Sequence, residues 1–140
     1  MADLVIDASL AAAWCFPDER TDYANDVLQA ISDSLEAVAP RLWAYEIRNS
    51  ILMGLRRGRI VRSDAEEFLD SLAHLNIHLA DPISYNAVLK LAEINGLTVY
   101  DAAYLDLAIR EGSYLASLDK ALCDAAVKAG IVLFSIPSTT

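Results

Sequence analysis

Four acidic residues, far apart in the sequence, stand where predicted strands end or helices begin: Asp7, Glu46, Asp101 and Asp119. Asp7 ends the short apolar run 3–6, and Asp119 follows the short apolar run 114–118. Short apolar runs of this kind are typical of buried strands. In an open parallel sheet, ligands bind beyond the carboxyl ends of the strands, where helices begin. We therefore expect the four carboxylates to meet at one edge of such a sheet.

Carboxylates gathered in this way have a specific chemical requirement. Two of them about 4 Å apart repel by roughly 4 kcal/mol at an effective dielectric constant near 20, so a cluster is retained only around a cation. Oxygen ligands near helix N-termini suit Mg²⁺ or Mn²⁺ better than zinc. Any one of the aspartates alone is explained as a helix cap or turn residue. The four together favour a metal site.

The elements that would position these acids alternate between strands and helices. We predict strands over residues 3–6, 37–39, 76–80, 114–118 and 131–136. We predict helices over residues 8–16, 21–34, 42–57, 63–74, 84–95, 101–111 and 120–129. This order is typical of an α/β sandwich with a mostly parallel, five-stranded twisted sheet and helices on both faces.

Local signals mark the ends of the predicted helices. Thr21 is a candidate N-cap, Ser63 to Glu66 reads as a capping box, and Asp101 is expected to open its helix. Glycines follow four of the helical patterns and are expected to end them: Gly58, Gly96, Gly112 and Gly130. The pattern over residues 42–57 is apolar around most of its circumference, which indicates a helix that is central or covered by a partner.

Composition limits the class of protein. With 140 residues, 55% of them hydrophobic, we expect one domain spanning 1–140. No run approaches the length of a membrane span, and the N-terminus lacks the basic and apolar regions of a signal peptide. Cys15 and Cys123 have no motif spacing, which agrees with a reducing cytoplasm. No phosphate-binding glycine motif occurs, which argues against nucleoside triphosphate and dinucleotide sites.

The charge is strongly negative overall and unevenly distributed. A net charge of −9 argues against a protein that coats nucleic acid, but not against an enzyme that meets phosphate through a bound cation. More than half of the basic residues are clustered: Arg41, Arg48, Arg56, Arg57, Arg59 and Arg62. Contact with RNA phosphates, contact with an acidic partner and a solvated helix end all remain open for this group. Asp106 lies about 140° around its helix from Asp101, so we expect it to be peripheral and solvated.

Four short motifs carry a resemblance to a known family. They are VIDAS with Asp7 and Ser9, YEIRN with Glu46 and Asn49, VYDAAYLDLA with Asp101, and LASLDKAL with Ser117 and Asp119. The chain resembles PIN-domain ribonucleases, in particular the VapC-type toxins of toxin–antitoxin pairs. The resemblance runs from Val5 to Leu133, with the acids in the family's order.

This resemblance implies a fold, a reaction and partners. The fold would be the PIN-like three-layer sandwich, and the four acids would hold Mg²⁺, or Mn²⁺ in its place, for the hydrolysis of RNA phosphodiester bonds. Ser9, Asn49 and Ser117 would orient carboxylates or water. The family usually forms homodimers and is inhibited by an antitoxin whose C-terminal segment fills the active-site groove. Helix 42–55 is a candidate surface for one of these contacts, to be tested at Ile51 or Leu55.

Two other functions remain open. One is a PIN-like binding module that has lost catalysis, against which the four intact acids argue. The other is a receiver-type phosphoacceptor domain, which also uses an acidic Mg²⁺ pocket on a parallel sheet. Such a domain would need paired acids after the first strand, whereas Ala8 and Ser9 follow Asp7 here.

Overall fold

A computed structural model of the chain describes residues 2–136. Its strands are β1 (Leu4–Ile6), β2 (Ala37–Pro40), β3 (Ile77–Ala80) and β4 (Tyr114–Ala116). Its helices are α1 (Ala8–Cys15), the 3₁₀ helix η1 (Pro17–Glu19), α2 (Asp22–Asp33), α3 (Leu42–Arg56), α4 (Arg62–Ala73), α5 (Tyr85–Asn95), α6 (Val99–Glu111) and α7 (Lys120–Lys128). Among the helices of residues 2–136, none has the length and apolar character needed to cross a lipid bilayer.

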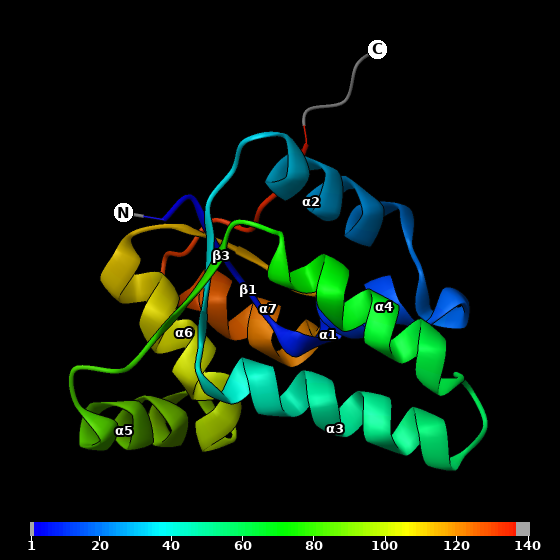
Figure 1. Cartoon of the computed structure of the whole chain (residues 1–140). Helices are drawn as coiled ribbons and strands as arrows, with labels where there is room; N and C mark the ends of the chain where they lie inside the picture. The colour runs from blue at the N-terminus through cyan, green and yellow to red at the C-terminus, as the bar shows by residue number, and fades with distance from the viewer. Residues whose placement is uncertain (1, 137–140) are drawn as a thin grey trace.

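The four strands form one parallel sheet in the order β3-β2-β1-β4. The connections from β1 to β2 and from β2 to β3 run in one direction across the sheet, and the connection from β3 to β4 runs back. Right-handed crossovers therefore place α1 to α4 on one face and α5 and α6 on the other. Figure 1 shows α2, α3 and α4 on the side opposite α5 and α6. The predicted α/β class, with a parallel sheet and helices on both faces, is confirmed.

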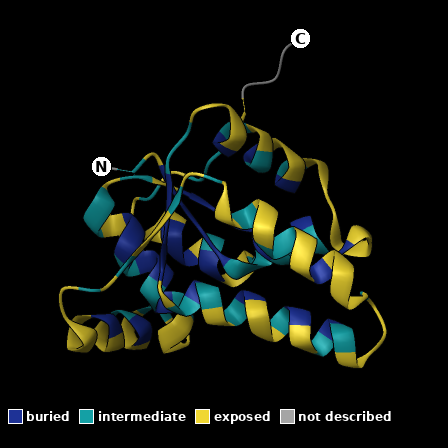
Figure 2. Ribbon diagram, viewed as in Figure 1, coloured by how far each residue is buried: buried dark blue, intermediate teal, exposed yellow. Residues whose placement is uncertain are grey.

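The core lies between the sheet and these helices. Leu4, Val5 and Ile6 of the central strand β1 have no exposed surface, as is typical of parallel strands covered on both faces. In Figure 2 the buried strands β1 and β2 are dark blue, the edge strand β3 is teal and yellow, and the helices carry dark blue on their inward sides. Trp43, on the inward side of α3, donates a hydrogen bond from Nε1 to the Asp7 backbone oxygen at 3.2 Å, which ties this helix to the end of β1.

The predicted fifth strand is wrong for the part of the chain that the structure describes. Residues 131–136 pair with β4 through a single bridge between Leu115 and Leu133. The Leu115 N–H donates to Val132 O, and the Phe134 N–H donates to Leu115 O. Strand β4 is itself only three residues long, and one bridge to it does not make a further strand.

Two predicted helix starts are also wrong. Helix α4 begins at Arg62 after Val61, with no side-chain cap, so the capping box predicted from Ser63 does not form. Helix α6 begins before Asp101, because the Thr98 hydroxyl accepts the Asp101 N–H at 3.1 Å and caps the helix one turn earlier.

Other predicted helix ends are confirmed. Thr21 caps α2 by accepting the Ala24 N–H at 3.0 Å. Gly96 and Gly112 follow α5 and α6 in the left-handed conformation, with φ of 64° and 60°, which glycine adopts without strain.

Candidate functional site

The four predicted carboxylates lie around the point where the chain reverses its direction across the sheet. From β1 the chain first builds β2 and β3 on one side, and β4 later pairs with the other side of β1. Asp7 follows β1 directly, and Asp119 follows β4 as the N-cap of α7. Glu46 lies in the second turn of α3, and Asp101 lies in the first turn of α6. Such reversal points are the usual ligand sites of parallel sheets.

Asp7 is the most deeply buried of the four carboxylates, with 5% of its surface exposed. It accepts hydrogen bonds from the hydroxyls of Ser9 at 2.6 Å and Ser117 at 2.5 Å, and a longer one from the Leu10 N–H at 3.4 Å. Burial raises the pKa of Asp7 above its ordinary value, the bonds from Ser117 and Ser9 oppose this rise, and the charge of Asp119 adds to it.

The two serines each join Asp7 to the segment after β4. The Ser9 hydroxyl accepts the Leu118 N–H, and the Ser117 hydroxyl accepts the Asp119 N–H, both at 2.9 Å. Each hydroxyl therefore uses its proton on Asp7 and its lone pair on a backbone amide. This arrangement leaves both serines with one orientation and holds Asp7 in place.

Glu46 is held by a residue that the sequence analysis did not identify. The hydroxyl of Tyr104, only 2% exposed, donates to Glu46 Oε1 at 2.5 Å. Burial, and then the neighbouring Glu46, raises the pKa of Tyr104 above its ordinary value. Tyr104 follows Asp101 by three residues, so both lie on the same face of α6. That spacing was the available signal, but the partner is 58 residues away in sequence.

The carboxylates act electrostatically on one another. Partial burial raises the pKa of Glu46 above its ordinary value; the Tyr104 hydrogen bond lowers it, and the charges of Asp101 and Asp7 raise it further. The pKa of Asp101 is likewise raised, first by partial burial and then by the charge of Asp119. All four acids therefore belong to one negative cluster, although they come from four separate parts of the chain.

No basic side chain neutralises this cluster within residues 2–136. The ion pairs formed there involve other acids: Asp18, Glu19, Glu36, Asp81, Asp106 and Asp124. In the side-chain conformations of the structure, no three acidic, histidine or cysteine side chains of residues 2–136 are close enough together to coordinate one metal ion. In donor type and charge, four carboxylates without a cationic partner fit a hard divalent ion such as Mg²⁺ or Mn²⁺. Asp101 and Asp119 are only partly buried, so they have room to turn toward an ion.

Two further predicted positions lie at the margin of the site. Asn49 is exposed on α3, three residues after Glu46. The expectation that Asp106 is solvated is wrong: its side chain is 16% exposed and pairs with Arg110 at 2.9 Å. Arg110 also donates to the backbone oxygen of Asp81 at 3.1 Å. The pair therefore anchors the segment after β3 and takes no part in the acidic cluster.

Helix α3 buries part of the surface proposed for a partner. Ile51 is 5% exposed and belongs to the core cluster, and Leu55 is partly buried against the same core. A helix on one face of a sheet must bury its apolar stripe against that sheet. Ile51 is therefore not available to a partner, whereas a contact at the half-buried Leu55 stays a prediction.

Known proteins are similar to this chain in sequence and in fold. Residues 4–128 match the PIN domain. Ribonuclease VapC3 of Pyrobaculum aerophilum is 38% identical over 129 residues, covering 86% of this chain and 92% of that protein. The crystal structure of PAE2754 from Pyrobaculum aerophilum has the same fold, with a TM-score of 0.69 at 22% identity, over 89% of this chain and 86% of that one. The chain belongs to the PIN-domain family, as a VapC-type member.

Proposed function

We propose that this chain is a metal-dependent endoribonuclease that hydrolyses RNA phosphodiester bonds with Mg²⁺, or with Mn²⁺ in its place. The observation that carries the proposal is the cluster of four mutually repelling carboxylates that no basic side chain neutralises within residues 2–136. The name of the relative Ribonuclease VapC3 supports the same reaction. The PIN match gives no support to the receiver-type alternative.

The proposed site divides its residues between holding an ion and holding the ligands. The carboxylates that would bind the ion are Asp7, Glu46, Asp101 and Asp119. A divalent ion there would lower the pKa of a water molecule and offset charge on the scissile phosphate. Ser9 and Ser117 fix Asp7, and Tyr104 fixes Glu46, so two ligands are oriented before an ion arrives. This chemistry requires no protein nucleophile.

Cleavage of single-stranded RNA by the purified protein tests the proposal. We expect cleavage with Mg²⁺, none with EDTA, and none from Asp7→Asn or Asp101→Asn. Asp26→Asn is the matched control, because Asp26 is exposed on α2 and its loss should leave activity unchanged. Activity that survives both chelation and the two site substitutions would contradict the mechanism. Complete inactivity of the wild-type protein would favour the catalytically silent binding module.

We further propose that the chain is the toxin of a toxin–antitoxin pair and acts on cellular RNA in the cytoplasm. The VapC-type relationship supports this. Expression without an antitoxin should arrest growth, and Asp101→Asn should abolish the arrest while Asp26→Asn should not. Normal growth with the wild-type chain folded and abundant would contradict the toxin assignment.

For a homodimer we propose the α5 patch, made of Ile83, Tyr85 and Leu89. These side chains are 88%, 76% and 48% exposed, which is unusual for apolar residues near one another. Tyr85 also lines a mostly apolar cavity of about 330 Å³, together with Val88 of the same helix and Tyr100 of α6. The double variant Ile83→Asp/Leu89→Asp should be monomeric by light scattering when the wild type is dimeric. An unchanged dimer would place the contact elsewhere.

A further inference from the structure

The outward face of α3 carries a row of side chains that no part of the described structure covers. We call it the α3 stripe: Tyr45, Arg48, Asn49, Leu52 and Arg56, all of them exposed. At 100° per residue, these five lie within about a third of the circumference of the helix. The buried side chains of α3, among them Trp43 and Ile47, lie on the opposite side.

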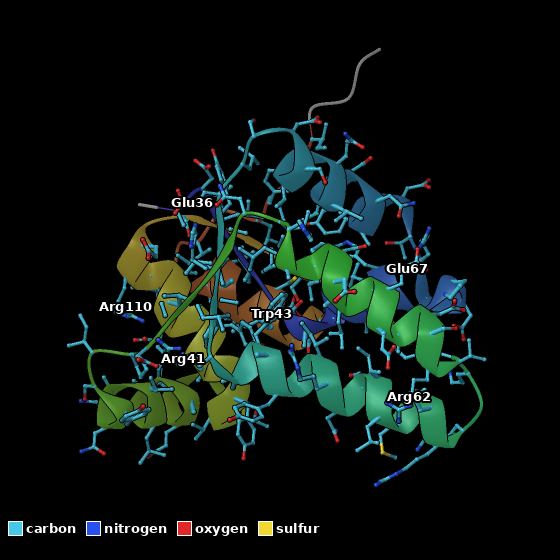
Figure 3. All side chains as sticks on the ribbon, in the orientation of Figure 1. Glu36, Arg41, Trp43, Arg62, Glu67 and Arg110 are labelled. Carbon is cyan, nitrogen blue, oxygen red and sulfur yellow. The ribbon has the colours of Figure 1, made fainter. Side chains whose placement is uncertain are left out.

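The arginines of the stripe differ from neighbouring arginines in having no acidic partner. Arg41 pairs with Asp81 at 2.9 Å, and Arg59 pairs with two acids of η1. Arg48 and Arg56, by contrast, make no ion pair with any of residues 2–136, and the same holds for Arg57 and Arg62 just beyond the helix. Figure 3 shows Arg41 near the start of α3 and Arg62 toward its other end. Arg48 donates to the Ala44 backbone oxygen at 3.0 Å, which leaves its charge unneutralised. In a chain of net charge −9, guanidinium groups without an acidic partner among residues 2–136 therefore gather along this helix.

The stripe is continuous with the acidic cluster. Glu46 lies on the same helix, Arg48 follows it by two residues, and Asn49 follows it by about one turn. Tyr45 is adjacent to Glu46 in the sequence, and 79% of its surface is exposed to solvent. Along α3, Tyr45 therefore immediately precedes Glu46, and the two arginines follow Glu46.

We propose that the α3 stripe binds the single-stranded RNA substrate beside the cleavage site. Arg48 and Arg56 contact phosphates, and the ring of Tyr45 stacks on a base near the scissile bond. This inference rests on the proposed nuclease function and names the surface that holds its substrate. Aromatic rings alternating with basic groups are the usual platform for single strands, because every base has a face to stack and every linkage has a charge.

The composition of the stripe favours RNA over a protein partner. Leu52, 40% exposed, is its only aliphatic member, so the stripe lacks the apolar centre typical of a protein interface. The acidic cluster repels a phosphate chain that approaches it. Guanidinium groups without an acidic partner, on the same helix as Glu46, offset this repulsion. An acidic peptide is the competing ligand, and the experiment below includes it.

Binding of a fluorescent single-stranded RNA, measured by anisotropy in EDTA over a series of KCl concentrations, tests the proposal without cleavage. Arg48→Gln/Arg56→Gln should weaken binding roughly tenfold and reduce the slope of log K against log[salt] by about 1.4, because each phosphate contact on a single strand contributes about 0.7. Tyr45→Ala should weaken RNA binding without changing the slope. Tyr45→Phe, which keeps the ring, should bind RNA as tightly as the wild type. Lys128→Gln, which removes an exposed cation on α7, is the control and should have no effect.

The outcomes separate this inference from the proposed function. If the wild type cleaves RNA with Mg²⁺ while the double arginine variant binds RNA as Lys128→Gln does, the stripe is not the RNA surface and the nuclease proposal stands. If binding depends on the two arginines and no metal supports cleavage, the surface stands and the nuclease proposal fails. If the arginine variant loses affinity for poly-glutamate and retains it for RNA, the stripe binds an acidic polypeptide and the inference is overturned.

Discussion

At the scale of single residues, the carboxylates are held by hydroxyl groups and by no cation among residues 2–136. Ser9 and Ser117 donate to Asp7, and Tyr104 donates to Glu46. A hydroxyl can orient a carboxylate without neutralising its charge, so the cluster stays negative while two of its members stay fixed. This combination preserves the attraction for a cation, whereas a lysine or arginine partner would remove it.

Tyr104→Phe tests this arrangement, because it removes one hydrogen bond and leaves the ring in the core. We expect the free energy of unfolding to fall by about 1–3 kcal/mol, since a partly buried carboxylate loses the only side-chain donor it has among residues 2–136. We also expect kcat to fall more than KM rises, because Glu46 is no longer oriented. Tyr85→Phe, at an exposed tyrosine, should change neither quantity. Wild-type kcat in Tyr104→Phe would show that the hydroxyl does not position Glu46.

At the scale of elements, helix α3 is placed by a close approach to the turn after α1. A Cβ added at Gly54 would lie 2.6 Å from the nearest ring carbon of Phe16. That ring is 1% exposed, and the Arg59 guanidinium carbon lies 4.3 Å from the centroid of the ring, so the ring has little room to move. The glycine therefore sets how closely α3 packs, and with it the position of Glu46.

Gly54→Ala should consequently destabilise the protein, although alanine is the better helix former by about 1 kcal/mol. We expect a net loss of about 1–3 kcal/mol in the free energy of unfolding, measured by urea denaturation, because the core is overpacked. Phe16→Leu in the same chain should recover part of the loss, which a double-mutant cycle measures as coupling between the two sites. A stabilised Gly54→Ala variant would mean that α3 shifts freely.

Which elements could be predicted depended on how local their determinants are. Gly96 and Gly112 end helices through their own conformation, so the sequence was sufficient. The cap at Thr98 is also local, but Asp101, three residues later, is of a residue type equally common at N-caps. The fifth strand depended on how far residues 131–136 pair with β4, and the bond from Tyr104 to Glu46 depended on tertiary packing. Neither of these is encoded in a short window of residues.

At the scale of the whole molecule, the fold brings acids from four distant segments together against their mutual repulsion. Burial first, and then the charges of neighbouring carboxylates, raises the pKa values of Asp7, Glu46 and Asp101 above their ordinary values, so ionisation of these groups weakens the folded state. Their contribution to stability is fully present below their unfolded pKa values and is lost as the pH rises through the raised folded ones. We therefore expect ionisation of these carboxylates to lower the free energy of unfolding of the metal-free protein at neutral pH.

Glu46→Gln should accordingly raise the melting temperature of the metal-free protein at neutral pH. The substitution removes one charge and keeps an oxygen that can accept the Tyr104 hydroxyl. The advantage should disappear below the ordinary glutamate pKa of about 4.3, where the wild-type side chain is protonated. Scanning calorimetry in EDTA at several pH values measures this. A variant less stable than the wild type at neutral pH would show that repulsion in the cluster is unimportant.

If the four carboxylates form one cation site, the RNA-free protein should bind Mn²⁺ there, and calorimetric titration measures this binding. We predict saturable Mn²⁺ binding by the wild type and by Asp26→Asn, and strongly weakened binding by Asp7→Asn, Glu46→Gln and Asp101→Asn. Equal Mn²⁺ binding by all five proteins, or none by the wild type, would show that these carboxylates do not form a cation site.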